Sequence, residues 1–154
     1  MRKLLATSIA MAIGIGSLNM ASARSFSAGD GKATDPTKTT AFTHSLGVGT
    51  VIAHLTGPGT LSWFACLPID NSGTKTVTVA ARAVSSTPDS RPTIRLVSND
   101  IDDGQFEQSG PVAIPVSATF TRVTLSIHAP SFGILLLEAR LNDGATLGGI
   151  VYNP

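Results

Sequence analysis

Polar side chains suited to holding a ligand recur at alternate positions in two segments of the sequence. Guanidinium, hydroxyl and imidazole groups hydrogen-bond well to hydroxylated molecules and to carboxylates. If the two segments are strands of one sheet, these groups lie together on its outer face, as the floor of a binding site or as ordinary solvated surface. They are Thr78 and Arg82 in "KTVTVAARA" (75–83) and Arg122, Thr124, Ser126 and His128 in "TFTRVTLSIHAP" (119–130).

Carboxylates gather in the segment "SNDIDDGQFE" (98–107), which contains Asp100, Asp102, Asp103 and Glu107. Hard oxygen ligands of this kind suit calcium. The spacing differs from that of an EF-hand loop, because reading back from Gly104 puts Ile101 where a carboxylate is required. The segment is therefore either a solvated turn or a calcium site. No other cofactor is predicted.

We recognise no catalytic motif in the sequence. The three histidines, His44, His54 and His128, stand apart and lack the His-x-x-x-His spacing of a zinc site. No Gly-x-Ser-x-Gly motif follows residue 23. Glycoside hydrolysis needs two carboxylates that face each other across a cleft, whereas the acids here cluster in one turn or stand singly. The sequence therefore predicts a protein that is not an enzyme.

The first 23 residues are typical of a secretory signal peptide. Arg2 and Lys3 precede the apolar run Leu4–Leu18, and Ala21-Ser22-Ala23 provides small residues for cleavage. The run of 15 residues is shorter than the roughly 20 that span a membrane, so no stable span is expected after cleavage. We expect export to the periplasm or to the outside of the cell.

The charge of the chain limits the classes of molecule that it can be expected to bind. Without residues 1–23 the chain has 9 basic and 10 acidic residues, a formal charge of −1, and no run of Lys or Arg. Nucleic acid is therefore not an expected partner.

Cys66 is the only cysteine, so no internal disulfide forms. Its apolar surroundings predict a buried thiol, and a bridge between two chains is the alternative.

Short segments rich in Val, Ile, Thr and Leu alternate with turn residues beyond residue 40. Such regular short strands are typical of a β-sandwich or barrel. We predict an all-β, antiparallel β-sandwich of the jelly-roll kind over 41–154, after a flexible polar segment at 24–40. The predicted strands are 41–46, 48–55, 60–69, 75–84, 93–98, 112–116, 119–128 and 133–141, with a ninth at 147–152.

Residues 75–145 also carry an ordered series of motifs. They are "KTVTVAARAVSS", "RPTIRLVSND", "SGPVAIPVSATFTRVTLSIHAP" and "FGILLLEARLNDG". An alternating strand, a short "IRLV" strand and a Ser-Gly loop precede a long strand and a last strand that ends in Asn-Asp-Gly. In this order they resemble the second half of a galactose-binding-like jelly roll of the carbohydrate-binding-module type. The resemblance implies a polysaccharide or cell-surface glycan as the ligand.

Modules of this kind hold sugar rings on flat aromatic side chains, and "LSWFACL" (61–67) offers two. Strict alternation puts Trp63 on the apolar side of this strand, which predicts a core position. Phe64 points the other way, as a partly exposed platform. The predicted ligand-binding residues are therefore Arg82, Arg122, His128 and Phe64.

Two functions fit these features best, and a third, a small hydrolase, would require His128 to pair with a carboxylate. The first is an exported, non-catalytic binding domain for carbohydrate or another cell-surface polymer. The alternative is a structural subunit of a surface or exported complex, in which residues 24–40 add a strand to the sheet edge of a partner. A monomer in solution favours the first function, and concentration-dependent oligomers favour the second.

Overall fold

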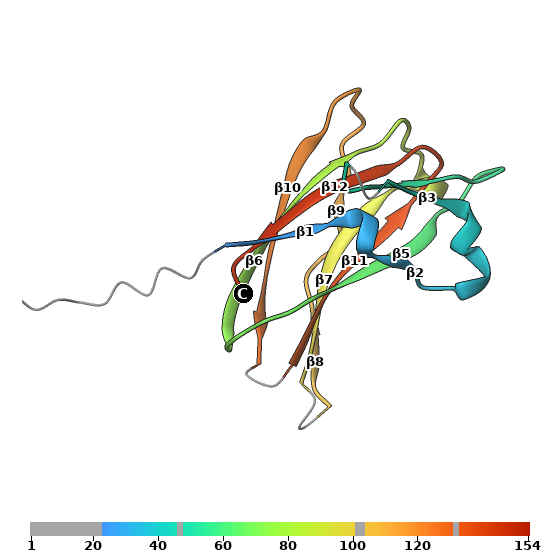
Figure 1. Cartoon of the computed structure of the whole chain (residues 1–154). Helices are drawn as coiled ribbons and strands as arrows, with labels where there is room; N and C mark the ends of the chain where they lie inside the picture. The colour runs from blue at the N-terminus through green and yellow to red at the C-terminus, as the bar shows by residue number, and fades with distance from the viewer. Residues whose placement is uncertain (1–22, 46–47, 101–103, 131–132) are drawn as a thin grey trace, which may run out of the picture.

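The computed structural model describes residues 23–45, 48–100, 104–130 and 133–154. Within these residues the chain forms two six-stranded sheets that pack face to face (Figure 1). The predicted signal peptide, apart from Ala23, lies outside the described residues. No helix among those residues has the length and apolar character needed to cross a membrane.

The strands of each sheet come from distant parts of the sequence, and all of the pairings between them are antiparallel. Sheet A has the order β10 (Thr121–Ala129), β6 (Gly73–Arg82), β12 (Thr146–Tyr152), β4 (Thr50–Ala53) and β3 (Phe42–Ser45), and β1 (Arg24–Ser27) also pairs with β12. Sheet B has the order β2 (Lys32–Ala33), β5 (Leu61–Leu67), β11 (Gly133–Leu141), β7 (Thr93–Asp100) and β8 (Phe106–Gln108), and β9 (Val112–Ala113) also pairs with β7. Three short 3-10 helices complete the described elements: η1 (Ala28–Asp30), η2 (Pro36–Ala41) and η3 (Pro88–Ser90).

The predicted all-β antiparallel sandwich is confirmed. Each predicted strand, from 41–46 to 147–152, coincides with an observed strand, although some are shorter. The short strand β8 was not predicted. The agreement arises because these segments alternate apolar and polar residues with a period of two, which buries one side of each strand.

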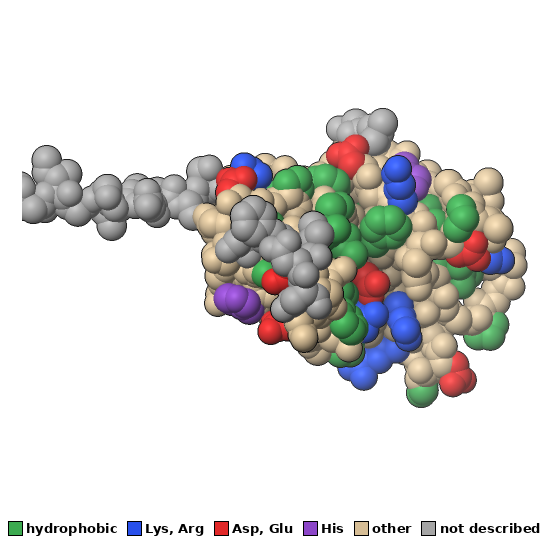
Figure 2. All heavy atoms as spheres, turned by 90° about the horizontal axis from the view of Figure 1, so that it is seen from below, with side chains coloured by type: hydrophobic (Ala, Val, Ile, Leu, Met, Phe, Trp, Pro, Cys, Tyr) green, Lys and Arg blue, Asp and Glu red, His purple; other side chains and the backbone are tan. Residues whose placement is uncertain are grey.

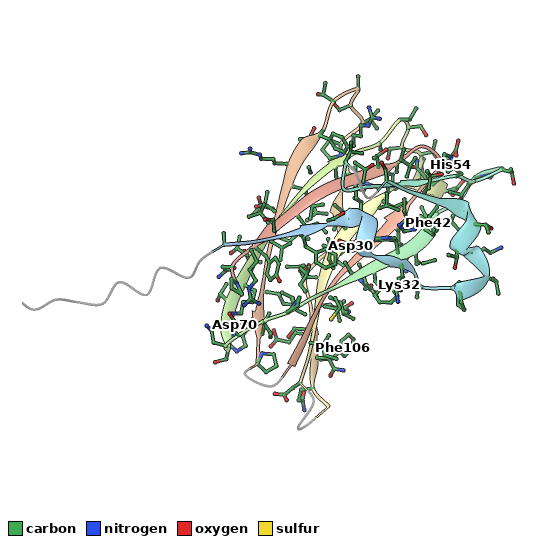
Figure 3. The ribbon with its side chains drawn as sticks, in the orientation of Figure 1. Asp30, Lys32, Phe42, His54, Asp70 and Phe106 are labelled. Carbon is green, nitrogen blue, oxygen red and sulfur yellow. The ribbon has the colours of Figure 1, made fainter. Side chains whose placement is uncertain are left out.

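Side chains from both sheets fill the space between them (Figure 3). In β6 and β10 the cross-strand pairs Val79–Val123 and Val77–Leu125 point into this core. Trp63 of β5 has no exposed surface, so its predicted core position is confirmed. Full burial of one Val or Leu side chain stabilises the fold by about 1.5–3 kcal/mol.

Residues 24–40, for which the polar composition predicted a flexible segment, contain β1, η1 and β2 and most of η2. Strand β1 pairs with β12 over its whole length, and Phe26, opposite Ile150, packs against the core. Helix η1 is capped by Ser27, whose Oγ accepts a hydrogen bond of 3.0 Å from the amide of Gly29. Backbone pairing compensates for the small number of apolar side chains here. The sandwich therefore begins at β1, beside β12 (Figure 1).

Cys66 is exposed, so the prediction of a buried thiol was wrong. Its apolar sequence neighbours Ala65 and Leu67 point into the core. Alternation along β5 turns Cys66 to the outer face of sheet B, beside Leu136 of β11. The alternative of a bridge between chains stays a prediction.

Candidate ligand-binding cleft

The predicted polar face exists on the outer side of sheet A, because β6 and β10 are neighbours in this sheet. Its hydroxyl groups bond to one another across the two strands. The Thr78 and Thr124 hydroxyls are 3.0 Å apart, and those of Thr76 and Ser126 are 3.1 Å apart. Cross-strand pairs of this kind stabilise a sheet. They account for these residues without a ligand.

The three cationic residues predicted on this face do not converge. Nη1 of Arg82 donates a hydrogen bond of 2.8 Å to the carbonyl of Ala118, and the guanidinium lies 5.3 Å from the centre of the Phe120 ring. Arg82 therefore anchors the loop before β10. Arg122 and His128 are exposed but lie six positions apart on β10, roughly 20 Å at about 3.4 Å per residue.

Phe64 lies on the opposite side of the molecule from these residues. It belongs to β5 of sheet B and is partly exposed on the outer face of that sheet, as its alternation predicted. Its cross-strand neighbours are Lys32 of β2 and Glu138 of β11. The predicted set of Arg82, Arg122, His128 and Phe64 is therefore split between two faces.

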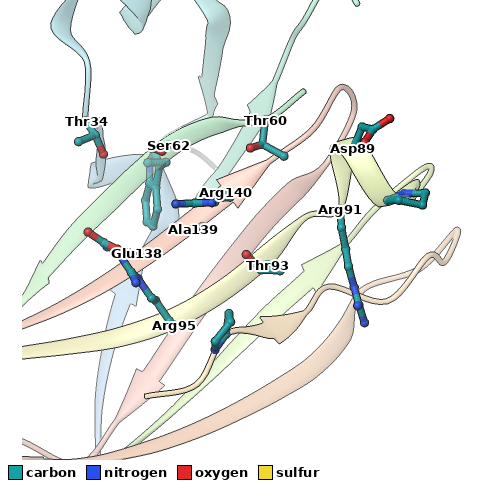
Figure 4. Close-up of a pocket in the computed structure, with 13 residues that line it drawn as sticks. Thr34, Thr60, Ser62, Asp89, Arg91, Thr93, Arg95, Glu138, Ala139 and Arg140 are labelled. Atoms are coloured by element: carbon teal, nitrogen blue, oxygen red, sulfur yellow. The ribbon is translucent and has the colours of Figure 1, made fainter. Parts of the chain in front are cut away.

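A cleft of about 450 Å³ lies over the outer face of sheet B (Figure 4). Phe64 is not among the residues that line it, but it is the cross-strand neighbour of Glu138, which is. Three neighbouring strands, β5, β11 and β7, form its floor. On this floor Arg140 of β11 lies between Ser62 of β5 and Thr93 of β7, and in the next row Glu138 lies between Phe64 and Arg95. Connecting segments on either side provide the walls with Thr34, Thr60, Pro88, Asp89, Arg91 and Pro111.

One of the arginines in the cleft is neutralised by the protein itself. Nε of Arg95 lies 2.6 Å from Oε2 of Glu138, and Nη1 donates to Oε1 of Gln108 at 2.5 Å. Figure 4 shows the Glu138 and Arg95 side chains directed toward each other. This pair leaves Glu138 able to accept further hydrogen bonds, because a carboxylate has about four acceptor positions.

The other two arginines, Arg91 and Arg140, form no ion pair with any residue that the structure describes. Both side chains are exposed. In Figure 4 the Arg140 side chain extends along the floor toward Ser62, whereas Arg91 stands on the far side of the cleft. The space-filling view shows one face of the molecule on which Lys and Arg side chains gather beside hydrophobic ones (Figure 2).

Sequence reasoning did not select Arg95, Glu138 or Arg140 as site residues. Each stands at an outward position of an alternating strand, and this is the signal that the sequence does contain. Their grouping depends on β11 lying between β5 and β7. Strand spacing in the sequence does not reveal that order.

The calcium proposal falls largely outside the described residues, because these exclude Asp102 and Asp103. Asp100 and Glu107 belong to β7 and to β8. Among the residues that the structure describes, no group of three or more His, Cys, Asp or Glu side chains is arranged to hold a metal ion. Calcium binding in 98–107 therefore stays a prediction.

Solved structures with a similar fold are carbohydrate-binding modules. One belongs to the lichenase 5A of Cellvibrio mixtus and was solved with cellotriose; it is 13% identical, with a TM-score of 0.53, over 85% of this chain and 96% of that chain. The C-terminal module of the laminarinase LamC of Zobellia galactanivorans is 10% identical, with a TM-score of 0.53, over 86% and 100%. A family 35 module from Clostridium thermocellum is 9% identical, with a TM-score of 0.52, over 85% and 97%.

The likeness to these structures is one of fold, since the identities are low. No protein-family model and no curated protein matches the sequence. The similarity extends over nearly the whole of each module and includes both sheets of this chain. The chain therefore has the β-sandwich jelly-roll fold of carbohydrate-binding modules, as the motifs in residues 75–145 implied.

Proposed function

We propose that this protein is an exported, non-catalytic carbohydrate-binding domain whose ligand lies in the cleft on sheet B. The observation that carries the proposal is the floor of the cleft, where a carboxylate, two guanidiniums and two hydroxyls share one outer face. A sugar hydroxyl both donates and accepts hydrogen bonds, so it needs acceptors and donors side by side. Glu138 supplies the acceptor, and Arg95 and Arg140 supply the donors.

Phe64 adds a hydrophobic surface beside this floor. Its ring is partly exposed, and it lies in the same cross-strand row as Glu138 and Arg95. A sugar unit that hydrogen-bonds to Glu138 can therefore rest its C–H face against the ring. Trp63 is fully buried and does not take this role.

Three further observations support the proposal. The similar folds include a module that was solved with cellotriose. The basic, apolar and small-residue regions of the first 23 residues support export. The absence of a catalytic motif from the sequence supports a binding role without catalysis.

The experiment that tests this function is a thermal-shift screen of the purified protein against soluble glycans, neutral and acidic. A ligand at about 100 times its dissociation constant stabilises the protein by about 2.7 kcal/mol, which raises the melting temperature measurably. We expect a saturable shift with one class of glycan. The absence of a shift with every glycan would contradict the proposal.

Variants then locate the site. Phe64→Ala and Glu138→Gln should each weaken binding about tenfold, which corresponds to about 1.4 kcal/mol. Arg122→Gln is the matched control, because Arg122 is exposed on the outer face of sheet A. Equal losses in all three variants would place the ligand elsewhere on the protein.

The alternative of an assembly subunit requires that residues 24–40 leave the protein to pair with a partner. In the structure β1 and β2 pair with β12 and β5 of the same chain. Size-exclusion chromatography at several concentrations separates the two functions. A monomer at all concentrations is the expected result.

A further inference from the structure

We infer that the cleft selects an acidic glycan, one whose sugar units carry a carboxylate or a sulfate group. This inference rests on the proposed carbohydrate-binding function and adds the chemical class of the ligand. It arises from the pairing of charges within the cleft. Three arginines, Arg91, Arg95 and Arg140, line the cleft together with two carboxylates, Asp89 and Glu138.

The two rows of side chains on the floor differ in how their charges are paired. In one row Arg95 has Glu138 as its cross-strand neighbour and forms an ion pair with it at 2.6 Å. In the other row Arg140 has Ser62 and Thr93 as its cross-strand neighbours, and neither can neutralise a guanidinium. Opposite charges across strands stabilise a sheet. Arg140 lacks such a partner and instead faces the cleft.

The surroundings of Arg140 suit an oxyanion. A guanidinium forms parallel, charge-assisted hydrogen bonds with the two oxygens of a carboxylate, or with two oxygens of a sulfate. Hydroxyls at Thr34, Thr60, Ser62 and Thr93 also line the cleft and can bond to the hydroxyls of the same sugar. Arg91 provides a second cation on the far side of the cleft, toward the neighbouring unit of a polymer.

Phe64, the aromatic surface proposed for stacking, lies beside the cleft and not in its lining. Of the described residues that line it, only Trp63 is aromatic, and it has no exposed surface. Neutral hydrogen bonds contribute modestly in water, because the same groups bond to solvent in the free state. A charge-assisted pair with Arg140 is stronger. The cleft is therefore better equipped for an acidic sugar than for a neutral one.

General attraction of polyanions does not explain such a preference. Without the first 23 residues the chain has a formal charge of −1, so any affinity for an acidic polymer must come from a local arrangement. Arg122 makes this testable, since it is an exposed arginine on the opposite sheet and carries the same charge as Arg140.

The experiment is isothermal titration calorimetry with two matched pairs of probes. Polygalacturonate is compared with its methyl ester, which has the same backbone without the charge, and dextran sulfate is compared with dextran. We expect the acidic member of at least one pair to bind about tenfold more tightly, with weaker binding at higher salt. Preference within the first pair identifies a carboxylate as the anion, and preference within the second identifies a sulfate.

The variants Arg140→Gln and Arg122→Gln decide the location. Arg140→Gln should lose about tenfold in affinity for the acidic probe, and Arg122→Gln should remain within about twofold of the parent protein. Equal losses in both variants, or equal binding of acidic and neutral probes, would overturn the inference. Binding of a neutral glycan alone would overturn it while leaving the proposed function intact. No glycan binding at all would overturn both.

Discussion

Gly31 follows η1 and lies against the indole of Trp63. A Cβ atom at this position would lie 1.9 Å from Cζ2 of Trp63 and 2.7 Å from the carbonyl oxygen of Phe64. Trp63 is fully buried, so moving its ring would disturb the core packed around it. The φ of Gly31, −76°, is open to any residue. A glycine is therefore required here by the lack of space for a side chain and not by the backbone conformation.

We expect Gly31→Ala to destabilise the protein by about 1–3 kcal/mol, the usual cost of overpacking a core. Urea unfolding followed by tryptophan fluorescence measures this loss, because Trp63 is the only tryptophan. Gly110→Ala is the matched control, since a Cβ atom there meets nothing within 4 Å. An unchanged free energy of unfolding in Gly31→Ala would contradict the packing described here.

At the scale of single elements, η2 begins at an aspartate cap. Oδ1 of Asp35 accepts hydrogen bonds from the Thr37 hydroxyl at 2.7 Å and from the Thr37 amide at 2.9 Å. These bonds hold the pKa of Asp35 below its ordinary value, and the bond from the hydroxyl has the larger effect. Because the pKa of Asp35 is lower in the folded state, the cap stabilises the fold at pH values above the pKa that Asp35 has in the unfolded chain. This contribution is lost as the pH falls through the folded pKa.

We expect Thr37→Val to raise the pKa of Asp35 toward its ordinary value, because the variant removes the hydroxyl donor and keeps the amide. NMR titration of the Asp35 carboxyl carbon measures the change. Thr37→Ser, which keeps a hydroxyl, is the control and should preserve the low pKa. An identical pKa in the valine variant would show that the hydroxyl bond does not form in solution.

The individual elements also show which structural features can be predicted from the sequence and which cannot. Alternation in 75–84 and 119–128 was sufficient to predict β6 and β10 and their inward faces. Strands β1 and β2, of four and two residues, are too short to show a period, and their pairing depends on β12 and β5. The cleft was missed for a related reason, since its floor combines three strands whose order depends on the tertiary fold.

At the scale of the whole molecule, one buried cation makes stability depend on pH. Lys75 of β6 is 1% exposed, and its Nζ donates a hydrogen bond of 2.7 Å to Oδ1 of Asn71. Burial lowers the pKa of Lys75, and the nearby charge of Asp70 opposes this effect. The unfolded chain therefore binds this proton more tightly, so the stability of the fold rises with pH toward the ordinary pKa of lysine.

We expect Lys75→Met to stabilise the protein by about 1 kcal/mol at pH 7, because a buried charge is replaced by an apolar side chain of similar length. The gain should shrink as the pH approaches the lysine pKa. Denaturant unfolding of both proteins at pH 7 and at an alkaline pH gives the two differences. Lys38→Met is a control for charge alone, because Lys38 is exposed. A loss of stability in Lys75→Met would mean that the ammonium has stronger partners than Asn71.

The strand order also has a consequence for the nascent chain. The last two strands in the sequence, β11 and β12, occupy interior positions, β11 between β5 and β7 and β12 between β6 and β4. Until β11 has left the ribosome, β5 and β7 lack the strand that joins them, and until β12 has left it, β6 and β4 lack theirs. Folding of such a non-local topology is slow. The two halves of each sheet can therefore fold only separately until the interior strand between them has been synthesised.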